Sequence, residues 1–201
     1  MSNTHVHKDY HGAKLGMWLF LFTEVLLFGG LFVLYAVFLS KYPQEFHDGG
    51  KELDVVIGTL NTVVLLVSSY FVALAISFIQ RGDKKKAILF TWLTMAMALM
   101  FLVNKFFEWK AKFSHGIYPT SPHLAELPHG ENIFFGLYYI MTGLHGIHVV
   151  IGMTVLGFMV NFLKRDIINR EDFVKLENAG LYWHIVDLVW IFLFPLFYLV
   201  L

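Results

Sequence analysis

The chain has 201 residues, of which 57% are hydrophobic and only 15% are charged, with a formal net charge of zero. Its mean hydropathy is +0.62. An apolar excess of this size, arranged in long unbroken runs, is typical of a polytopic membrane protein and exceeds what a soluble domain needs. The balanced charge gives no indication of nucleic-acid binding. Cysteine is absent, which excludes disulfides, thiolate metal sites, two-cysteine copper sites and iron–sulfur clusters.

The apolar runs divide the chain into five predicted membrane spans. Residues 1–14 are polar and predict a short N-terminal arm, and no cleavable signal peptide is expected because the apolar run that follows is too long. Residues 15–201 are predicted to form one membrane domain. Its spans are predicted at 15–39, 54–80, 87–110, 133–163 and 176–201. Each is long enough to cross a bilayer as a helix, so the sequence predicts an all-α bundle of five transmembrane helices.

Basic residues are distributed unevenly between the two sides of this predicted bundle. Five spans place the N-terminus and the loops 81–86 and 164–175 on one side of the membrane. That side carries ten lysines and arginines, whereas the loops of the other side carry four. Because cytoplasmic loops are enriched in Lys and Arg, we expect a cytoplasmic N-terminus and a C-terminus outside.

The fourth span carries glycines on one side and histidines on the other. When the span is drawn as a helix with about 100° per residue, four of its glycines fall within one arc of about 80°. These glycines are Gly136, Gly143, Gly146 and Gly157. A stripe of small residues lets a neighbouring helix approach closely. His145 and His148 lie roughly opposite, and imidazoles in hydrocarbon face protein, water or a ligand rather than lipid. Both sides of this helix are therefore predicted to be occupied.

Other spans also carry ionisable side chains, which are candidates for function by default because they are expensive inside a membrane. Glu24 lies about 14 Å inside the first span. Glu177, His184 and Asp187 share one side of the last span and form a polar stripe that starts at its cytoplasmic end. We hypothesise that Glu24, His148, His184 and Asp187 form a buried polar network that fixes three helices.

Three further residues are candidates for contacts with lipid or with neighbouring helices: Asn61, Trp183 and Trp190. Glu108, near the outer end of the third span, has Lys105 and Lys112 within i−3 and i+4 reach. This pairing is predicted to be structural.

The residues alone leave three interpretations open. A haem-binding bundle would use His145, His148 and His184, but histidines at i and i+3 lie on one face and cannot hold a single haem between them. A stand-alone proton relay or transporter would use the carboxylates and imidazoles in sequence. In the third interpretation, these groups form satisfied hydrogen bonds between helices, and the bundle supports a larger complex or binds lipid.

Six motifs in order resemble subunit III of the haem–copper terminal oxidases. They are LFTEVLLFGGLF around Glu24, LNTVVLLVSS at 60–69, GDKKKA after the second span, FFEWK at 106–110, TGLHGIHVVIG at 142–152 and ENAGLYWHIVDLVWIFLF at 177–194. The resemblance runs from about residue 15 to the C-terminus. It is to the shorter, five-helix bacterial form rather than to the seven-helix form, which has two further N-terminal helices.

The resemblance implies a non-catalytic subunit of a proton-translocating oxidase that reduces oxygen to water, multi-pass in a bacterial inner membrane. It implies no cofactor or metal in this chain, with the haems and copper held in partner subunits I and II. Subunit III of this family binds phospholipid, sustains proton uptake and protects the catalytic site from turnover-linked inactivation. Glu24 matches the family's intramembrane glutamate that reacts with carbodiimides. Within the family, a subunit III-like accessory protein of a nitric oxide reductase is the alternative.

Overall fold

The computed structural model of the chain describes residues 10–114, 116–118 and 121–199. In this part of the chain, five helices are long and apolar enough to cross a membrane. They are α1 (Tyr10–Lys41), α3 (Val55–Gln80), α4 (Lys84–Ser114), α6 (His129–Lys164) and α7 (Val174–Tyr198). The prediction of an all-α fold with five spans is therefore confirmed.

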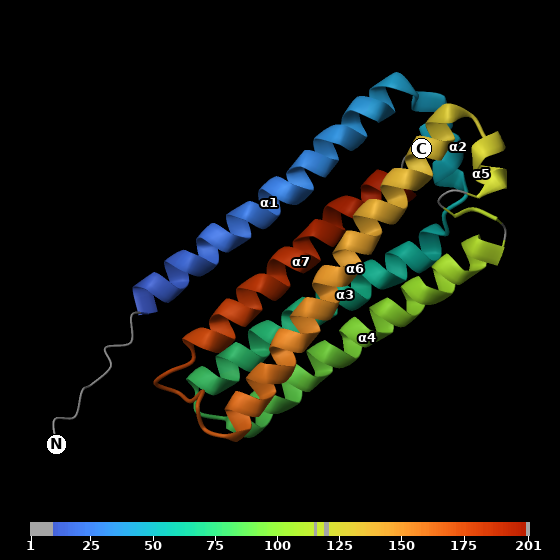
Figure 1. Ribbon diagram of the computed structural model, residues 1–201. Coiled ribbons are helices and arrows are strands. Elements are labelled where there is room, and N and C mark those ends of the chain that lie inside the picture. The colour runs from blue at the N-terminus through green and yellow to red at the C-terminus, as the bar shows by residue number, and fades with distance from the viewer. Residues whose placement is uncertain (1–9, 115, 119–120, 200–201) are drawn as a thin grey trace, which may run out of the picture.

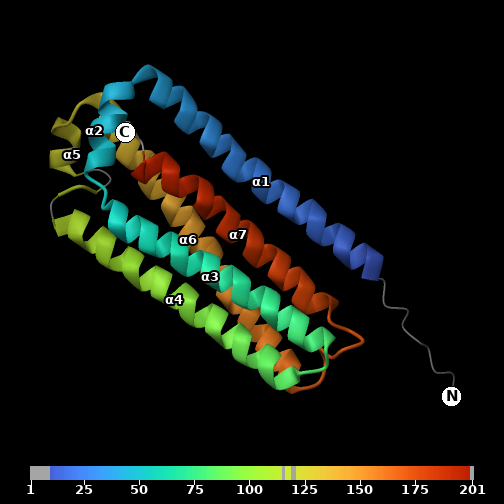
Figure 2. The same ribbon diagram turned by 180° about the vertical axis from the view of Figure 1, so that it is seen from behind.

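The five long helices run alongside one another between two distinct ends, as Figures 1 and 2 show. One end holds the start of α1, the turn between α3 and α4, and the loop between α6 and α7. We call it the basic end because Arg81, Lys84, Lys85 and Arg165 lie there. The other end, here the capped end, holds the last turn of α7 and two short helices, α2 (Pro43–Lys51) and α5 (Pro122–Glu126).

Most helix boundaries extend past the predicted spans because a helix continues through the polar interface after the hydrocarbon ends. The largest difference is at α1, which begins at Tyr10. Residues 10–14 of the predicted polar arm are therefore helical, while residues 1–9 lie outside the described part of the chain. The C-terminal residues 200–201 of the last predicted span lie outside it too, and α7 ends at Tyr198.

Two predicted loops contain short helices, which corrects the prediction of loops at 40–53 and 111–132. Helix α2 starts with a proline, whose fixed φ suits a first helical turn, and it buries Phe46 completely. Helix α5 is capped by the Ser121 hydroxyl, which accepts a hydrogen bond from the Leu124 amide at 3.0 Å. Neither helix is long enough to give a helical period in the sequence.

A glycine makes the tight turn between α3 and α4. Gly82 has φ +82°, a conformation that residues with a Cβ rarely adopt. The next residue, Asp83, accepts a hydrogen bond from the Lys86 amide at 3.1 Å and so caps α4. This turn sets α3 against α4, and the two pack closely along their length.

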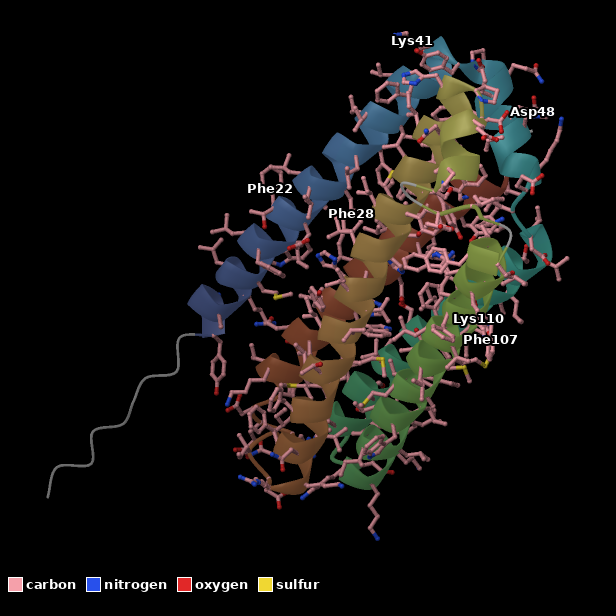
Figure 3. The ribbon with its side chains drawn as sticks, turned by 45° about the vertical axis from the view of Figure 1, so that its right-hand side comes forward. Phe22, Phe28, Lys41, Asp48, Phe107 and Lys110 are labelled. Carbon is pink, nitrogen blue, oxygen red and sulfur yellow. The ribbon has the colours of Figure 1, made fainter. Side chains whose placement is uncertain are left out.

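Helix α1 is the least buried of the five helices, and α7 is the most buried. The buried residues of α1 are Leu21, Phe28 and Tyr35, which follow one another at intervals of seven residues. Figure 3 shows Phe28 on the side of α1 that faces the bundle and Phe22 on the opposite side. The Tyr35 hydroxyl donates a hydrogen bond to the backbone oxygen of Leu196. A single stripe thus attaches α1 to α6 and α7.

Candidate functional site

Glu24 and His148 are in hydrogen-bond contact between α1 and α6. Their atoms Oε2 and Nε2 are 2.9 Å apart, and the side chains are 15% and 11% exposed. The contact joins the middle of α1 to the middle of α6. The Phe28 ring meets the imidazole edge-on, with ring centroids 5.3 Å apart, and the Tyr182 hydroxyl donates to the His148 backbone oxygen at 3.3 Å.

The other imidazole nitrogen decides how this pair holds its proton. His148 Nδ1 lies 2.7 Å from the backbone oxygen of Leu144. A carbonyl oxygen only accepts, so Nδ1 carries a hydrogen. Nε2 then either accepts from a protonated Glu24 or donates to its carboxylate. The pair is electrically neutral in both states, which suits a site inside a membrane.

His145 is one turn away from His148 but has a different environment. Its side chain is fully buried, between the rings of Phe101 and Trp190 at 5.5 and 5.2 Å. Neither ring nitrogen has a hydrogen-bond partner. The structure therefore does not join His145 to the pair formed by Glu24 and His148.

The predicted stripe on α7 follows one side of the helix from the basic end inward. Glu177 forms an ion pair with Lys14 at 2.9 Å. About two helical turns deeper, His184 Nδ1 lies 2.6 Å from the Ser69 hydroxyl of α3. Asp187 is 3% exposed, and the only polar groups beside its two oxygens are the Ser68 and Ser69 hydroxyls of α3. Among the described residues, no hydrogen bond links this stripe to Glu24 and His148, so the four predicted network residues lie in two separate groups.

The residues proposed for lipid or helix contacts lie in the interior. Trp183 and Trp190 are fully buried and donate to Ser68 and Thr62 of α3, both at 3.0 Å. Asn61 accepts from the Asn104 amide at 2.9 Å. All three therefore contact neighbouring helices of this chain.

The glycine stripe of α6 makes few close contacts inside the chain. A Cβ at Gly136 or Gly146 would meet nothing within 4 Å, while Gly143 and Gly157 lie beside Trp109 and Met95 side chains at 3.2 and 3.8 Å. Close packing instead involves Gly152, on the histidine side, where a Cβ would lie 2.8 Å from the Trp183 ring. Within this chain, Gly136 and Gly146 therefore do not bring a neighbouring helix close.

The most extensive buried polar cluster, which we call the capped-end cluster, contains Lys105, Glu108, Tyr138 and Tyr198. The Lys105 ammonium donates to Glu108 at 3.1 Å, Tyr138 at 3.1 Å and Tyr198 at 2.6 Å. Both tyrosine hydroxyls donate to Glu108 Oε1, at 2.6 and 2.5 Å. These contacts fasten α4, α6 and α7 to one another.

Every hydrogen of the capped-end cluster has an acceptor. The ammonium has three hydrogens and three acceptors, and each hydroxyl donates to the carboxylate. The pairing of Lys105 with Glu108 follows from their spacing, but the two tyrosines are 30 and 90 residues from Glu108. No sequence signal links such residues, which is why sequence reasoning missed them.

The described residues include no group of three His, Asp or Glu side chains arranged to hold a metal ion. The three membrane histidines also differ in their availability as haem ligands. His148 uses both ring nitrogens, and His184 uses one. His145 is enclosed by aromatic rings.

The fold and the site together define a class: a polytopic helical membrane protein whose interior holds paired, hydrogen-bonded ionisable groups. Comparison with known proteins makes the assignment specific. The family model described as cytochrome c oxidase subunit III matches residues 1–200. The chain belongs to this family, the subunits III of haem–copper terminal oxidases, and the resemblance found in the sequence is confirmed.

The relatives include subunits named for cytochrome c oxidases and subunits named for quinol oxidases. The chain is 30% identical to cytochrome c oxidase subunit 3 of Thermostichus vulcanus, over 99% of this chain and 92% of that protein. It is 28% identical to a probable quinol oxidase subunit 3 of Staphylococcus saprophyticus subsp. saprophyticus, over 99% and 95%. A heme-copper oxidase subunit I+III of Aeropyrum pernix is 30% identical over 93% of this chain and 22% of its own length.

Proposed function

We propose that this chain supports the catalytic subunit of a terminal oxidase without performing redox chemistry itself. In this proposal the basic end faces the cytoplasm, in accord with the positive-inside rule. The chain lies in a bacterial inner membrane beside subunits I and II, which hold the haems and copper. It stabilises the catalytic subunit, sustains its proton uptake and limits its inactivation during turnover.

Association with subunit I is supported by a relative. The Aeropyrum pernix protein is named heme-copper oxidase subunit I+III, so there the two subunits are one chain. Covalent fusion places two domains at high effective concentration, which favours neighbouring positions in the assembly. We infer the same neighbourhood for this chain as a separate subunit.

Lipid binding is supported by two apolar grooves along α1. The first has a volume of about 380 Å³ and lies near the basic end, between α1, α6 and α7; Phe20, Val155 and Tyr182 are among its lining residues. Lys175 and Asn178 also line it and offer polar atoms to a lipid headgroup. The second, of about 230 Å³, lies between α1 and α7 and includes Phe28.

The observation that carries the proposal is the position of the Glu24–His148 pair between these grooves. Phe28 lines one groove and contacts the His148 ring. Tyr182 lines the other and donates to the His148 backbone. Lipid in the grooves would therefore exclude water from a pair that is stable as a neutral unit. We infer that the pair fixes α1 at the depth where the grooves meet.

The test is to delete the chain and purify the remaining oxidase. We expect nearly unchanged haem content and initial oxygen-reduction rate, with inactivation after fewer turnovers, and restoration by re-expressing the chain. Phospholipid should co-purify in larger amount with the complete complex. Loss of the haem spectrum from a correctly folded catalytic subunit would contradict the non-catalytic assignment. An equal turnover lifetime without the chain would contradict the protective role.

A further inference from the structure

Asp187 differs from the other carboxylates of the spans because it is enclosed without a charged partner. It is 3% exposed, and no charged or backbone group donates a hydrogen bond to either oxygen. The titratable side chains near the middle of the helices packed against α7 include Glu24, Tyr70, His145 and His148, and none of them is among the groups that hydrogen-bond Asp187 or shift its charge. The groups beside it are the hydroxyls of Ser68 and Ser69 on α3. A carboxyl in such a site is stable as the neutral acid.

A polar route connects Asp187 with the basic end. A cavity of about 340 Å³ opens there, and its lining includes Lys14, Glu177 and His184. The ion pair between Lys14 and Glu177 lies at its mouth. His184 Nδ1 is 2.6 Å from the Ser69 hydroxyl, and Ser69 lies beside Asp187. The groups from Glu177 to Asp187 thus follow one another along α7 and α3.

The two serines beside Asp187 are not equivalent. The Ser68 hydroxyl donates to the Leu65 backbone oxygen at 2.7 Å and accepts from the Trp183 indole at 3.0 Å. Its only proton is therefore committed to a backbone acceptor. The Ser69 hydroxyl contacts the His184 ring, which faces the cavity. Only Ser69 can both receive a proton from the histidine and give one to the carboxylate.

We propose that Asp187 is a proton-binding site that is loaded from the basic end through His184 and Ser69. In the loading step, the Ser69 O–H bond breaks as an O–H bond forms at Asp187. The Nδ1–H proton of His184 moves to the Ser69 oxygen, and a proton from bulk solvent, carried by water in the cavity, binds at His184 Nε2. No electrons are transferred. A role for this site as a store of protons for a neighbouring catalytic subunit rests on the function proposed above. The existence of the proton-binding site does not depend on that function.

Infrared spectroscopy of the purified oxidase complex tests the site without turnover. The difference between the spectra of the wild-type and Asp187→Asn complexes should contain the C=O stretch of a neutral carboxylic acid. Transfer to D₂O should shift this band as the acid proton exchanges. In Ser69→Ala the band should persist while its exchange slows by about tenfold or more, since the relay hydroxyl is absent. Ser68→Ala is the matched control and should exchange at the wild-type rate.

Three results would overturn the proposal. The first is the absence of the acid band from about pH 5 to about pH 9, which would mean an ionised Asp187. The second is equal exchange rates in Ser69→Ala and Ser68→Ala, which would mean that protons arrive by another route. The third is loss of the band on adding sodium chloride but not choline chloride, which would identify a sodium site. None of these measurements depends on oxygen reduction. A failure of the Asp187 proposal can therefore be distinguished from a failure of the proposed subunit role.

Discussion

The capped-end cluster and the α7 stripe are both buried polar regions of one bundle, yet they are built in opposite ways. In the cluster, an ammonium, a carboxylate and two hydroxyls satisfy one another, and three helices meet through them. In the stripe, Asp187 has no charged partner and only the hydroxyls of Ser68 and Ser69 beside it, and His184 uses one nitrogen. The saturated region is suited to fixing structure, while the unsatisfied one retains the capacity to take up a proton.

This difference follows from the cost of changing the charge of each region. In the cluster, adding or removing a proton leaves a buried donor or acceptor without its partner, so a change of charge state costs a hydrogen bond. Asp187 has no charged partner to lose. Protonation of a group in such a site therefore depends on access to water and not on breaking a contact.

The largest expected effect comes from breaking the cluster with Glu108→Gln. This change leaves the Lys105 charge buried without its counterion, which should destabilise the fold by about 3–5 kcal/mol. Thermal denaturation of the purified complex and the retained amount of this chain would measure it. The double variant Lys105→Met with Glu108→Leu should recover much of the loss. A double variant as unstable as Glu108→Gln would show that the unpaired Lys105 charge does not cause the loss of stability.

Asp187→Leu should act in the opposite direction. Replacing an unpaired buried carboxyl by an apolar side chain of similar size removes a desolvation cost, so we expect a gain of about 1–3 kcal/mol. The same denaturation measurement applies, with Glu108→Leu as the comparison. If both single changes destabilise equally, the contrast between the two regions is wrong.

Glu24→Gln should change stability by less than about 1 kcal/mol, because the glutamine amide can still donate to His148 Nε2. The complex should assemble with normal haem content. The number of turnovers before inactivation should nevertheless fall several-fold. The reason is that a glutamine amide cannot pass a proton to and from His148 Nε2 as the Glu24 carboxyl can. Repeated oxygen pulses on reconstituted enzyme would measure the lifetime. An unchanged lifetime would count against a protective role for this pair.

The smallest effect is expected outside the spans, at Asp83. Hydrogen bonds from the Lys86 backbone and side chain lower the pKa of this carboxyl from 3.8. Such a carboxylate stabilises the folded state at pH values above its pKa in the unfolded chain. This stability is lost as the pH falls through the pKa of the carboxyl in the folded chain. Amide exchange in the first turn of α4, corrected for intrinsic rates, should therefore rise below about pH 4. Asp83→Asn should cap equally well and remove this acid dependence; an unchanged dependence would assign it to another group.

The helical period of the sequence predicted which side each polar residue of a helix faces, but not which helix it meets. Glu24, His148 and Asp187 were each predicted to face the interior. Their partners depend on how each helix is rotated against its neighbours, which the sequence of one helix does not contain. Hence Glu24 lies against His148 of α6, while His184 contacts Ser69 of α3, a residue with no ionisable group to mark it.

Side chains with two possible roles were the hardest to predict. Tyr138 and Tyr198 fit an apolar interface as well as a polar one, so nothing indicated that both bind Glu108. The glycines of α6 showed a similar ambiguity. Their stripe is regular, but Gly136 and Gly146 meet open space while Gly152 lies against Trp183. Regular spacing alone therefore did not identify the closely packed surface.

The three-residue stripe that attaches α1 has a consequence for the order of synthesis. Leu21, Phe28 and Tyr35 are made first, but α6 and α7, on which they pack, begin only at His129 and Val174. Until then α1 lacks the membrane-spanning helices on which it packs, and its length and apolarity allow it to persist in lipid. The contacts of α1 with α6 and α7 therefore close late in biogenesis, after both of these later helices have been made.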